Sequence, residues 1–116
     1  MTGEEAVVIT TTAHDATVIT LRGEIDEENA PYLARALTRA AADDGPGRTV
    51  VDLSGTPFVD SSVLHALLDA QRAHTAAGSV LVLAGPLHTA VRRLFEVTGS
   101  APAFRMADSL ATAMTC

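Results

Sequence analysis

The chain has 116 residues, of which 47% are hydrophobic, and this length and composition suit a single domain with one apolar core. Its 14 acidic and 8 basic residues give a formal net charge of −6, and every basic residue is an arginine. This balance argues against a nucleic-acid-binding protein, so protein or small-molecule partners are favoured. The only cysteine, Cys116, excludes an internal disulfide and a cysteine-based zinc site.

Signals for export or membrane insertion are not recognisable in the sequence. Residues 1–8 lack a basic stretch followed by an apolar one, and no apolar run approaches the roughly 20 residues of a membrane-spanning helix. We therefore expect a cytoplasmic protein in a reducing compartment, with no membrane partner.

The N-terminal third of the chain predicts a β-hairpin followed by a helix. Residues 7–12 and 17–22 are rich in β-branched side chains, and residues 13–16 separate the two runs. A helical pattern then continues up to the glycine- and proline-containing breaker at residues 43–47. Its apolar face holds Ala30, Leu33, Ala36, Leu37 and Ala40, and Arg35 and Arg39 point away from that face.

Strands and helices alternate in the middle of the chain. Residues 49–54 predict a third strand, and the helical pattern that follows ends at Gly78. Residues 79–84 are apolar on both faces, as expected of a central strand covered from both sides. Pro86 suits the first turn of the next helix, which ends near Gly99.

The C-terminal part of the chain completes the pattern. Residues 103–106 predict a short strand, and a last helix begins at Asp108 or Ser109. The order is ββαβαβαβα, which predicts an α/β fold with a mixed β-sheet and about four helices. No repeat or linker interrupts the pattern, so we expect one domain over residues 5–116.

The junction at residues 50–64 joins a buried strand to a helix start that carries hydroxyl groups. If Asp60 caps the helix, Ser61 is its first residue, close to backbone N–H groups and to the positive end of the helix dipole. A phosphate on Ser61 would add about −1.5 to −2 charges, which this position tolerates. Judged by composition alone, such a cluster serves more often as a plain helix cap.

Four segments in this order resemble the STAS domain of bacterial anti-sigma factor antagonists. They are Gly-Glu-Ile-Asp at 23–26, Val-Asp-Leu-Ser at 51–54, Phe-Val-Asp-Ser-Ser at 58–62, and the run at 91–99. The resemblance covers nearly the whole chain, and its most specific part is the Asp-Ser-Ser element after a strand. It implies an anti-anti-sigma factor that regulates transcription: the protein binds an anti-sigma factor with serine kinase activity and thereby frees a sigma factor.

The resemblance also implies the residues of the site. Ser61 would be the phosphorylation site, with Ser62 as the alternative, and phosphorylation would end the binding in a partner-switching cycle. A serine phosphatase is a further partner that such a cycle allows. The partner-binding residues would be Asp26, Asp60, Ser61, Ser62 and Val63. Repulsion by the added charge and steric exclusion are both open as the cause of release.

The chain departs from the family pattern at two positions. Val63 stands where the family usually has glycine, and His65 stands where a small residue is common. A β-branched residue costs a helix only about a few tenths of a kcal/mol. We therefore expect Val63 to change the shape of the docking face rather than the fold.

Catalytic and cofactor sites are not expected. Ser61 and His65 are helical neighbours, but no group is placed to orient the imidazole, and the Gly-x-Ser-x-Gly elbow is absent. His14, His74 and His88 are interpreted as surface histidines without metal-ligand spacing. Nucleotide-binding loops are also absent, and we predict no enzyme, no cofactor and no metal. The alternative to an antagonist is a non-phosphorylated STAS scaffold, or an accessory subunit of a transport or signalling complex.

Overall fold

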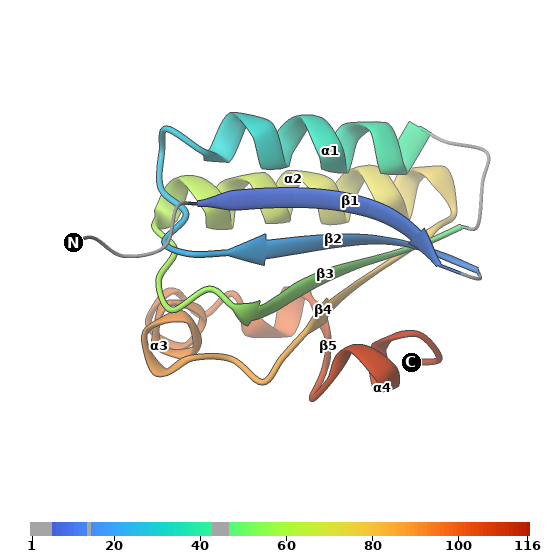
Figure 1. Cartoon of the computed structure of the whole chain (residues 1–116). Helices are drawn as coiled ribbons and strands as arrows, with labels where there is room; N and C mark the ends of the chain where they lie inside the picture. Colours follow the sequence, from blue (N-terminus) through green and yellow to red (C-terminus); the bar gives the residue numbers. More distant parts are fainter. Residues whose placement is uncertain (1–5, 14, 43–46) are drawn as a thin grey trace.

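A computed structural model of the chain describes residues 6–13, 15–42 and 47–116, and shows helices packed against a mixed β-sheet (Figure 1). The strands are β1 (Val7–Ala13), β2 (Ala16–Arg22), β3 (Arg48–Gly55), β4 (Val80–Ala84) and β5 (Arg105–Ala107). The helices are α1 (Ala30–Ala42), α2 (Ser61–Ala77), α3 (Thr89–Thr98), α4 (Leu110–Ala113) and the short 3-10 helix η1 (Ala101–Ala103). The sheet order is β1-β2-β3-β4-β5. The first pair is antiparallel and the others are parallel, which confirms the predicted α/β fold and its element order.

The strands divide their side chains between two apolar clusters, one on each face of the sheet. Ile19, Val51 and Leu83 point to the larger cluster, to which α1, α2 and α3 contribute. Val18, Val50 and Val82 point to the smaller one, which Ala113 of α4 covers. This alternation follows from the two-residue repeat of a strand, and it explains why the central strands are apolar on both faces.

The observed ends of α2 and α3 agree with the ends predicted from the sequence at Gly78 and Gly99. Gly78 and Gly99 have φ values of 75° and 66°, and their N–H groups donate to carbonyls of the last turns of α2 and α3. A side chain with a Cβ is disfavoured in this left-handed conformation, so glycine makes a sharp stop at both positions.

The start of α3 differs from the sequence prediction. Pro86 does not lie in the first helical turn; it follows Gly85 through a cis peptide bond in a loop, and α3 begins at Thr89. The reason is that the residue after β4 is still hydrogen-bonded to β5, since the Gly85 N–H donates to the Ala107 carbonyl at 2.8 Å. Pairing with β5 therefore holds this segment away from helical geometry.

The predicted strand at residues 103–106 is also shifted. Residues 101–103 form η1, with Pro102 in its first turn, and β5 begins at Arg105. A proline near the start of a short helical turn loses no hydrogen bond there, because its missing N–H has no partner inside the helix.

His74 is buried, so its interpretation as a surface histidine is wrong. Its Nδ1 lies 2.7 Å from the Ala70 carbonyl oxygen, and its Nε2 lies 2.8 Å from the Thr49 hydroxyl. A carbonyl can only accept, so Nδ1 carries a proton, and in the neutral imidazole Nε2 then accepts from the Thr49 hydroxyl. His74 therefore joins α2 to β3 inside the core. His88 is exposed as expected, and His14 lies outside the described residues.

No helix in the described part of the chain combines the length and the apolar character that crossing a bilayer requires.

Candidate functional site

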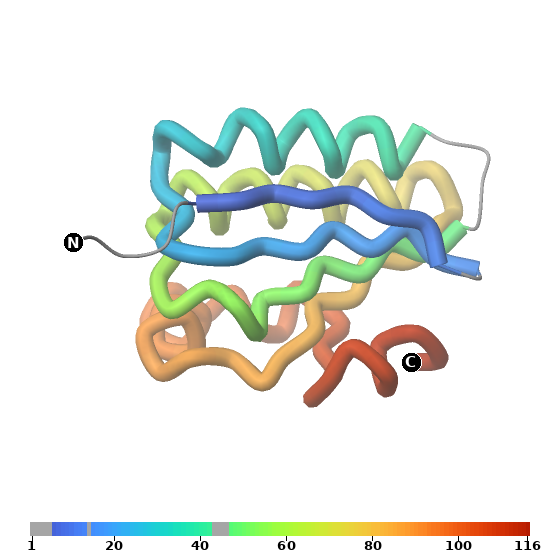
Figure 2. Tube along the Cα trace, in the orientation of Figure 1, coloured from blue at the N-terminus to red at the C-terminus, as the bar shows by residue number. Residues whose placement is uncertain are grey.

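The connections that leave β2 and β3 meet at one end of the sheet. Because these strands are parallel, both connections start from the same edge, and Figure 2 shows them side by side in blue-cyan and green. The Ile25 N–H donates to the Phe58 carbonyl at 3.1 Å, and the Asp60 N–H donates to the Ile25 carbonyl at 3.3 Å. Ile25 and Val59 form a parallel bridge. Asp26 and Asp60, far apart in sequence, are therefore the residues that come directly after this junction of Ile25 with Val59.

The buried Thr56 side chain stabilises this junction by hydrogen bonds to both connections. Its hydroxyl hydrogen-bonds to the Gly23 carbonyl and lies 3.2 Å from the Phe58 carbonyl. Gly23 in turn donates its N–H to the Gly55 carbonyl at 3.1 Å, with a φ of 77° that favours glycine. The sequence does not single out Thr56, although a polar residue directly after Gly55 at a strand end is a usable signal.

Asp60 caps α2, as predicted. Its backbone is extended, with φ −102° and ψ −176°, and its Oδ1 accepts hydrogen bonds from the N–H groups of Ser62 and Val63 at 3.0 and 3.3 Å. The carboxylate therefore occupies two of the N–H groups that a helix start leaves without partners. An added anion at this helix start would have to share the site with Asp60.

Ser61 is the first residue of α2 and is exposed, whereas Ser62 is half-buried. A kinase must bring its nucleotide's terminal phosphoryl group to the hydroxyl oxygen in line, so access to solvent matters. On this criterion Ser61 is the more accessible of the two serines.

Val63 does not lie on the surface. It is 0% exposed and packs in the larger core cluster with Leu67 and Val59. The expectation that its side chain shapes the docking face is therefore wrong: the bulk of valine faces inward, where it adds apolar burial. The backbone N–H of Val63 donates to Asp60, so Val63 supports the cap of α2 and is not part of the surface.

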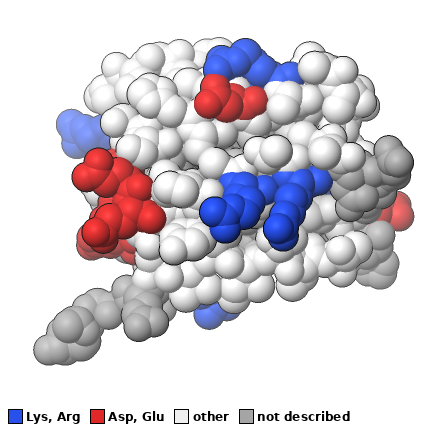
Figure 3. All heavy atoms as spheres, turned by 90° about the horizontal axis from the view of Figure 1, so that it is seen from above, with Lys and Arg blue, Asp and Glu red and all other residues white. Residues whose placement is uncertain are grey.

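Asp26 organises the loop before α1. Its Oδ1 accepts from the Glu28 N–H at 3.0 Å, and its carbonyl accepts from the N–H groups of Asn29 and Ala30 at 3.0 and 2.8 Å. Its side chain is half-buried, and Glu27 and Glu28 beside it are exposed. Acidic side chains gather at this end of the molecule in Figure 3. The candidate site is thus an acidic rim around an exposed serine.

His65 is exposed on α2, and the hydrogen bonds of the described residues include none between His65 and Ser61. Among the described residues, no base is hydrogen-bonded to the Ser61 hydroxyl, as a serine nucleophile requires. Within the same residues no group of three or more His, Cys, Asp or Glu side chains could hold a metal ion.

Replacing Asp60 by alanine is expected to lower the free energy of unfolding by about 1 kcal/mol, because two N–H groups at the start of α2 lose their acceptor. Urea denaturation followed by circular dichroism measures this change. Asp60→Asn keeps a capping oxygen and is the matched control, expected within a few tenths of a kcal/mol of the wild type. Equal stability of the two variants would contradict the assignment of the cap.

Comparisons with known proteins agree with this geometry. The family model described as STAS domain matches residues 7–113. An anti-sigma factor antagonist from Mycobacterium paratuberculosis is 25% identical, with a TM-score of 0.84 over 96% of this chain and 92% of that one. A Thermotoga maritima protein is 19% identical, with a TM-score of 0.81 over 92% and 91%.

SpoIIAA, an anti-sigma factor antagonist, is matched in two forms. The unphosphorylated form is 19% identical, with a TM-score of 0.73 over 93% of this chain and 94% of that one. The phosphorylated form, from Bacillus, is also 19% identical, with a TM-score of 0.72 over 93% and 96%. The family model covers nearly all of the sequence, and the chain therefore belongs to the STAS domain family.

Proposed function

We propose that this protein is an anti-sigma factor antagonist, and that phosphorylation of Ser61 ends its binding to an anti-sigma factor with serine kinase activity. The observation that carries the proposal is the exposed Ser61 hydroxyl at the start of α2, beside the capping carboxylate of Asp60. The 25% identity to an antagonist over almost the full length supports the role. The phosphorylated form of SpoIIAA supports the modification.

The phosphoryl transfer itself needs no catalytic group from this chain. The Ser61 oxygen attacks the terminal phosphorus of the kinase's ATP, the bond to the leaving ADP breaks, and the hydroxyl proton passes to a base of the kinase or to solvent. What the chain supplies is an acceptor on a fixed helix start. The hydrogen bonds from Ser62 and Val63 to Asp60 hold the backbone on which Ser61 is presented.

The acidic surroundings explain why one phosphate has a large effect. Asp60 already accepts from two N–H groups of the first turn, so the helix start cannot fully neutralise about −1.5 to −2 further charges. Asp26 lies at the same backbone junction. The charge of the phosphate beside these two carboxylates, and its bulk against close-packed atoms of the partner, would together oppose docking.

Phe58 adds an apolar contact to the proposed docking surface. Its carbonyl is part of the junction with Ile25, and its side chain is 43% exposed, which is unusual for a large aromatic residue. Exposed aromatic residues often contribute most of the binding energy at the centre of an interface. The docking surface proposed here therefore consists of Asp26, Phe58, Asp60, Ser61 and Ser62.

Phe58→Ala is expected to weaken binding to the anti-sigma factor by about tenfold or more, because the partner loses an aromatic anchor. Isothermal titration calorimetry with the unphosphorylated proteins measures the affinity. Leu110→Ala, which also removes an exposed large apolar side chain but from α4, is the matched control and should bind like the wild type. Equal losses for both variants would remove Phe58 from the docking surface.

Displacement of a sigma factor tests the proposed function. The chain is added to a preformed complex of the cognate sigma factor with its anti-sigma kinase, and free sigma factor is measured by size-exclusion chromatography. We expect release without ATP, and its loss after incubation with ATP. The Ser61→Ala variant should release sigma factor in both conditions. Failure to bind the kinase or to release sigma factor would overturn the antagonist role and favour a scaffold.

A further inference from the structure

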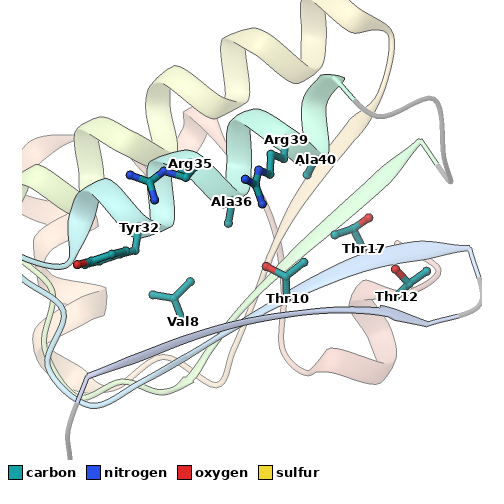
Figure 4. A pocket seen from close by; sticks show the side chains of 9 residues that line it. All are labelled: Val8, Thr10, Thr12, Thr17, Tyr32, Arg35, Ala36, Arg39 and Ala40. Atoms are coloured by element: carbon teal, nitrogen blue, oxygen red, sulfur yellow. The ribbon is translucent and has the colours of Figure 1, made fainter.

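A second surface feature lies between β1 and α1, away from Ser61. This β1–α1 groove has a volume of about 340 Å³. Its main lining residues are Val8, Thr10 and Thr12 of β1, and Tyr32, Arg35 and Arg39 of α1 (Figure 4). None of the residues of the proposed docking surface lines it.

The sequence explains why the groove exists. Val8, Thr10 and Thr12 alternate along β1 and therefore share one face of the strand. Arg35 and Arg39 are one helical turn apart on α1, and the alanines at positions 36 and 40 beside them are too small to fill the space above β1. The leucine face of α1 packs into the core, so its arginine side stays open over the edge of the sheet.

β1 is an edge strand without the usual protection. It stands first in the sheet order and pairs with β2 alone among the described strands. Residues 9–12 are exposed, and the pairing runs without a bulge from Val7 to Ala13. Natural edge strands commonly carry charges, proline or a bulge that prevents pairing with another chain, and β1 has none of these. One side of its backbone is therefore available for a further strand.

The groove is positively charged in a chain of net charge −6. Arg35 and Arg39 line it, no Asp or Glu does, and no carboxylate of the described residues lies within ion-pair distance of either arginine. The Arg35 guanidinium lies 5.9 Å from the centre of the Tyr32 ring, which holds it over the groove. Figure 3 shows basic side chains in the middle of this face, with acidic ones beside the upper basic group and at the left end.

We propose that the β1–α1 groove binds an extended acidic segment of a partner protein, which adds to the sheet beside β1 and directs alternate carboxylates to Arg35 and Arg39. Adding a strand to an exposed sheet edge is a common mode of peptide recognition. The spacing fits: residues two apart on a strand are separated by about 6.8 Å, and Arg35 and Arg39 by about 6 Å along the helix axis. α1 runs along β1 in Figure 1, so side chains two apart on a strand beside β1 can each lie near one of the two arginines.

A second copy of this chain is a poorer occupant. Pairing of two β1 strands about a two-fold axis would bring the arginines of both copies along one seam, with no carboxylate in either groove. An acidic segment instead supplies the charge that the groove lacks. The proposal concerns a surface separate from Ser61, and it stands or falls independently of the antagonist role.

Fluorescence polarisation with a labelled peptide in which glutamate and valine alternate tests the proposal. We expect saturable binding to the wild type, and binding roughly five- to thirtyfold weaker for the double variant Arg35→Gln, Arg39→Gln. The double variant Arg92→Gln, Arg93→Gln removes the same charge from α3 and is the matched control, expected within about twofold of the wild type.

Two further peptides separate charge from strand pairing. A peptide with glutamine in place of glutamate tests the carboxylates, and one methylated at alternate backbone nitrogens tests the added strand; both should bind more weakly. Absence of binding to the wild type, equal loss in both double variants, or undiminished binding of the methylated peptide would overturn the proposal. So would dimerisation through β1, detected as cross-linking between copies after Thr11→Cys.

Discussion

Ser61→Glu is expected to weaken binding to the anti-sigma factor kinase by about tenfold or more, while Ser61→Ala binds like the wild type. The glutamate places a permanent negative charge beside Asp60, whose carboxylate already uses the N–H groups of Ser62 and Val63. The new charge therefore has little compensation within the chain. Titration calorimetry with the unphosphorylated kinase measures the difference.

The control for this prediction is a charge of the same size elsewhere on α2. Ala76→Glu adds it at the exposed far end of the helix, and we expect unchanged affinity. Ser62→Glu tests the neighbouring hydroxyl, whose half-buried position in the docking surface should make the variant less stable as well as weaker in binding. If Ser61→Glu and Ala76→Glu bound equally well, the charge at Ser61 would not control the interface.

His74→Leu is expected to lower the free energy of unfolding by roughly 1–3 kcal/mol, although leucine is the more apolar residue. The reason is that the buried Thr49 hydroxyl, 2% exposed, loses the Nε2 acceptor that lies 2.8 Å away. A buried hydroxyl without a partner costs its full desolvation. Urea denaturation of the variant, followed by circular dichroism, measures the loss.

A double-mutant cycle separates this hydrogen bond from the change in shape. Thr49→Val leaves the His74 Nε2 without a donor, and the double variant removes both polar groups together. We expect the double variant to be more stable than the sum of the single changes implies, by about 1 kcal/mol. Strictly additive losses would show that the bond between His74 and Thr49 does not stabilise the core.

Three helix ends and the burial of the central strands on both faces could be predicted from the sequence because their causes are local. Asp60 begins α2 with its own side chain, and Gly78 and Gly99 end helices with their own φ angles. The two-residue alternation of a strand sends Val50 and Val51 to opposite faces of the sheet, so both faces of β3 are apolar. These features need no knowledge of the rest of the fold.

Most errors of the sequence prediction arise where a contact between residues distant in sequence decides the position of a side chain. Val63 belongs to a buried stripe of α2 with Leu67, Ala70 and His74, spaced four, three and four residues apart. The helical period could have placed Val63 in the core, but a histidine on that stripe is recognisable only with its partner Thr49, 25 residues away. The groove above β1 cannot be predicted from the sequence either, since it depends on where α1 lies over the sheet.

Only part of the candidate site can be predicted from the sequence. The Asp-Ser-Ser element marks the helix start, but the junction that brings Asp26 next to Asp60 depends on two backbone hydrogen bonds and on the buried Thr56. Pairing between parallel strand ends of this kind has no sequence signal of its own. Phe58 likewise becomes a candidate only when its exposure is known.

The most direct test of the central claim is the intact mass of the protein after incubation with the cognate anti-sigma kinase and ATP, with the modified residue located by fragmentation. We expect a single phosphate on Ser61 that is absent from Ser61→Ala and present on Ser62→Ala. Tight binding to the kinase with no phosphate, or a phosphate on another residue, would contradict the switch proposed at the start of α2.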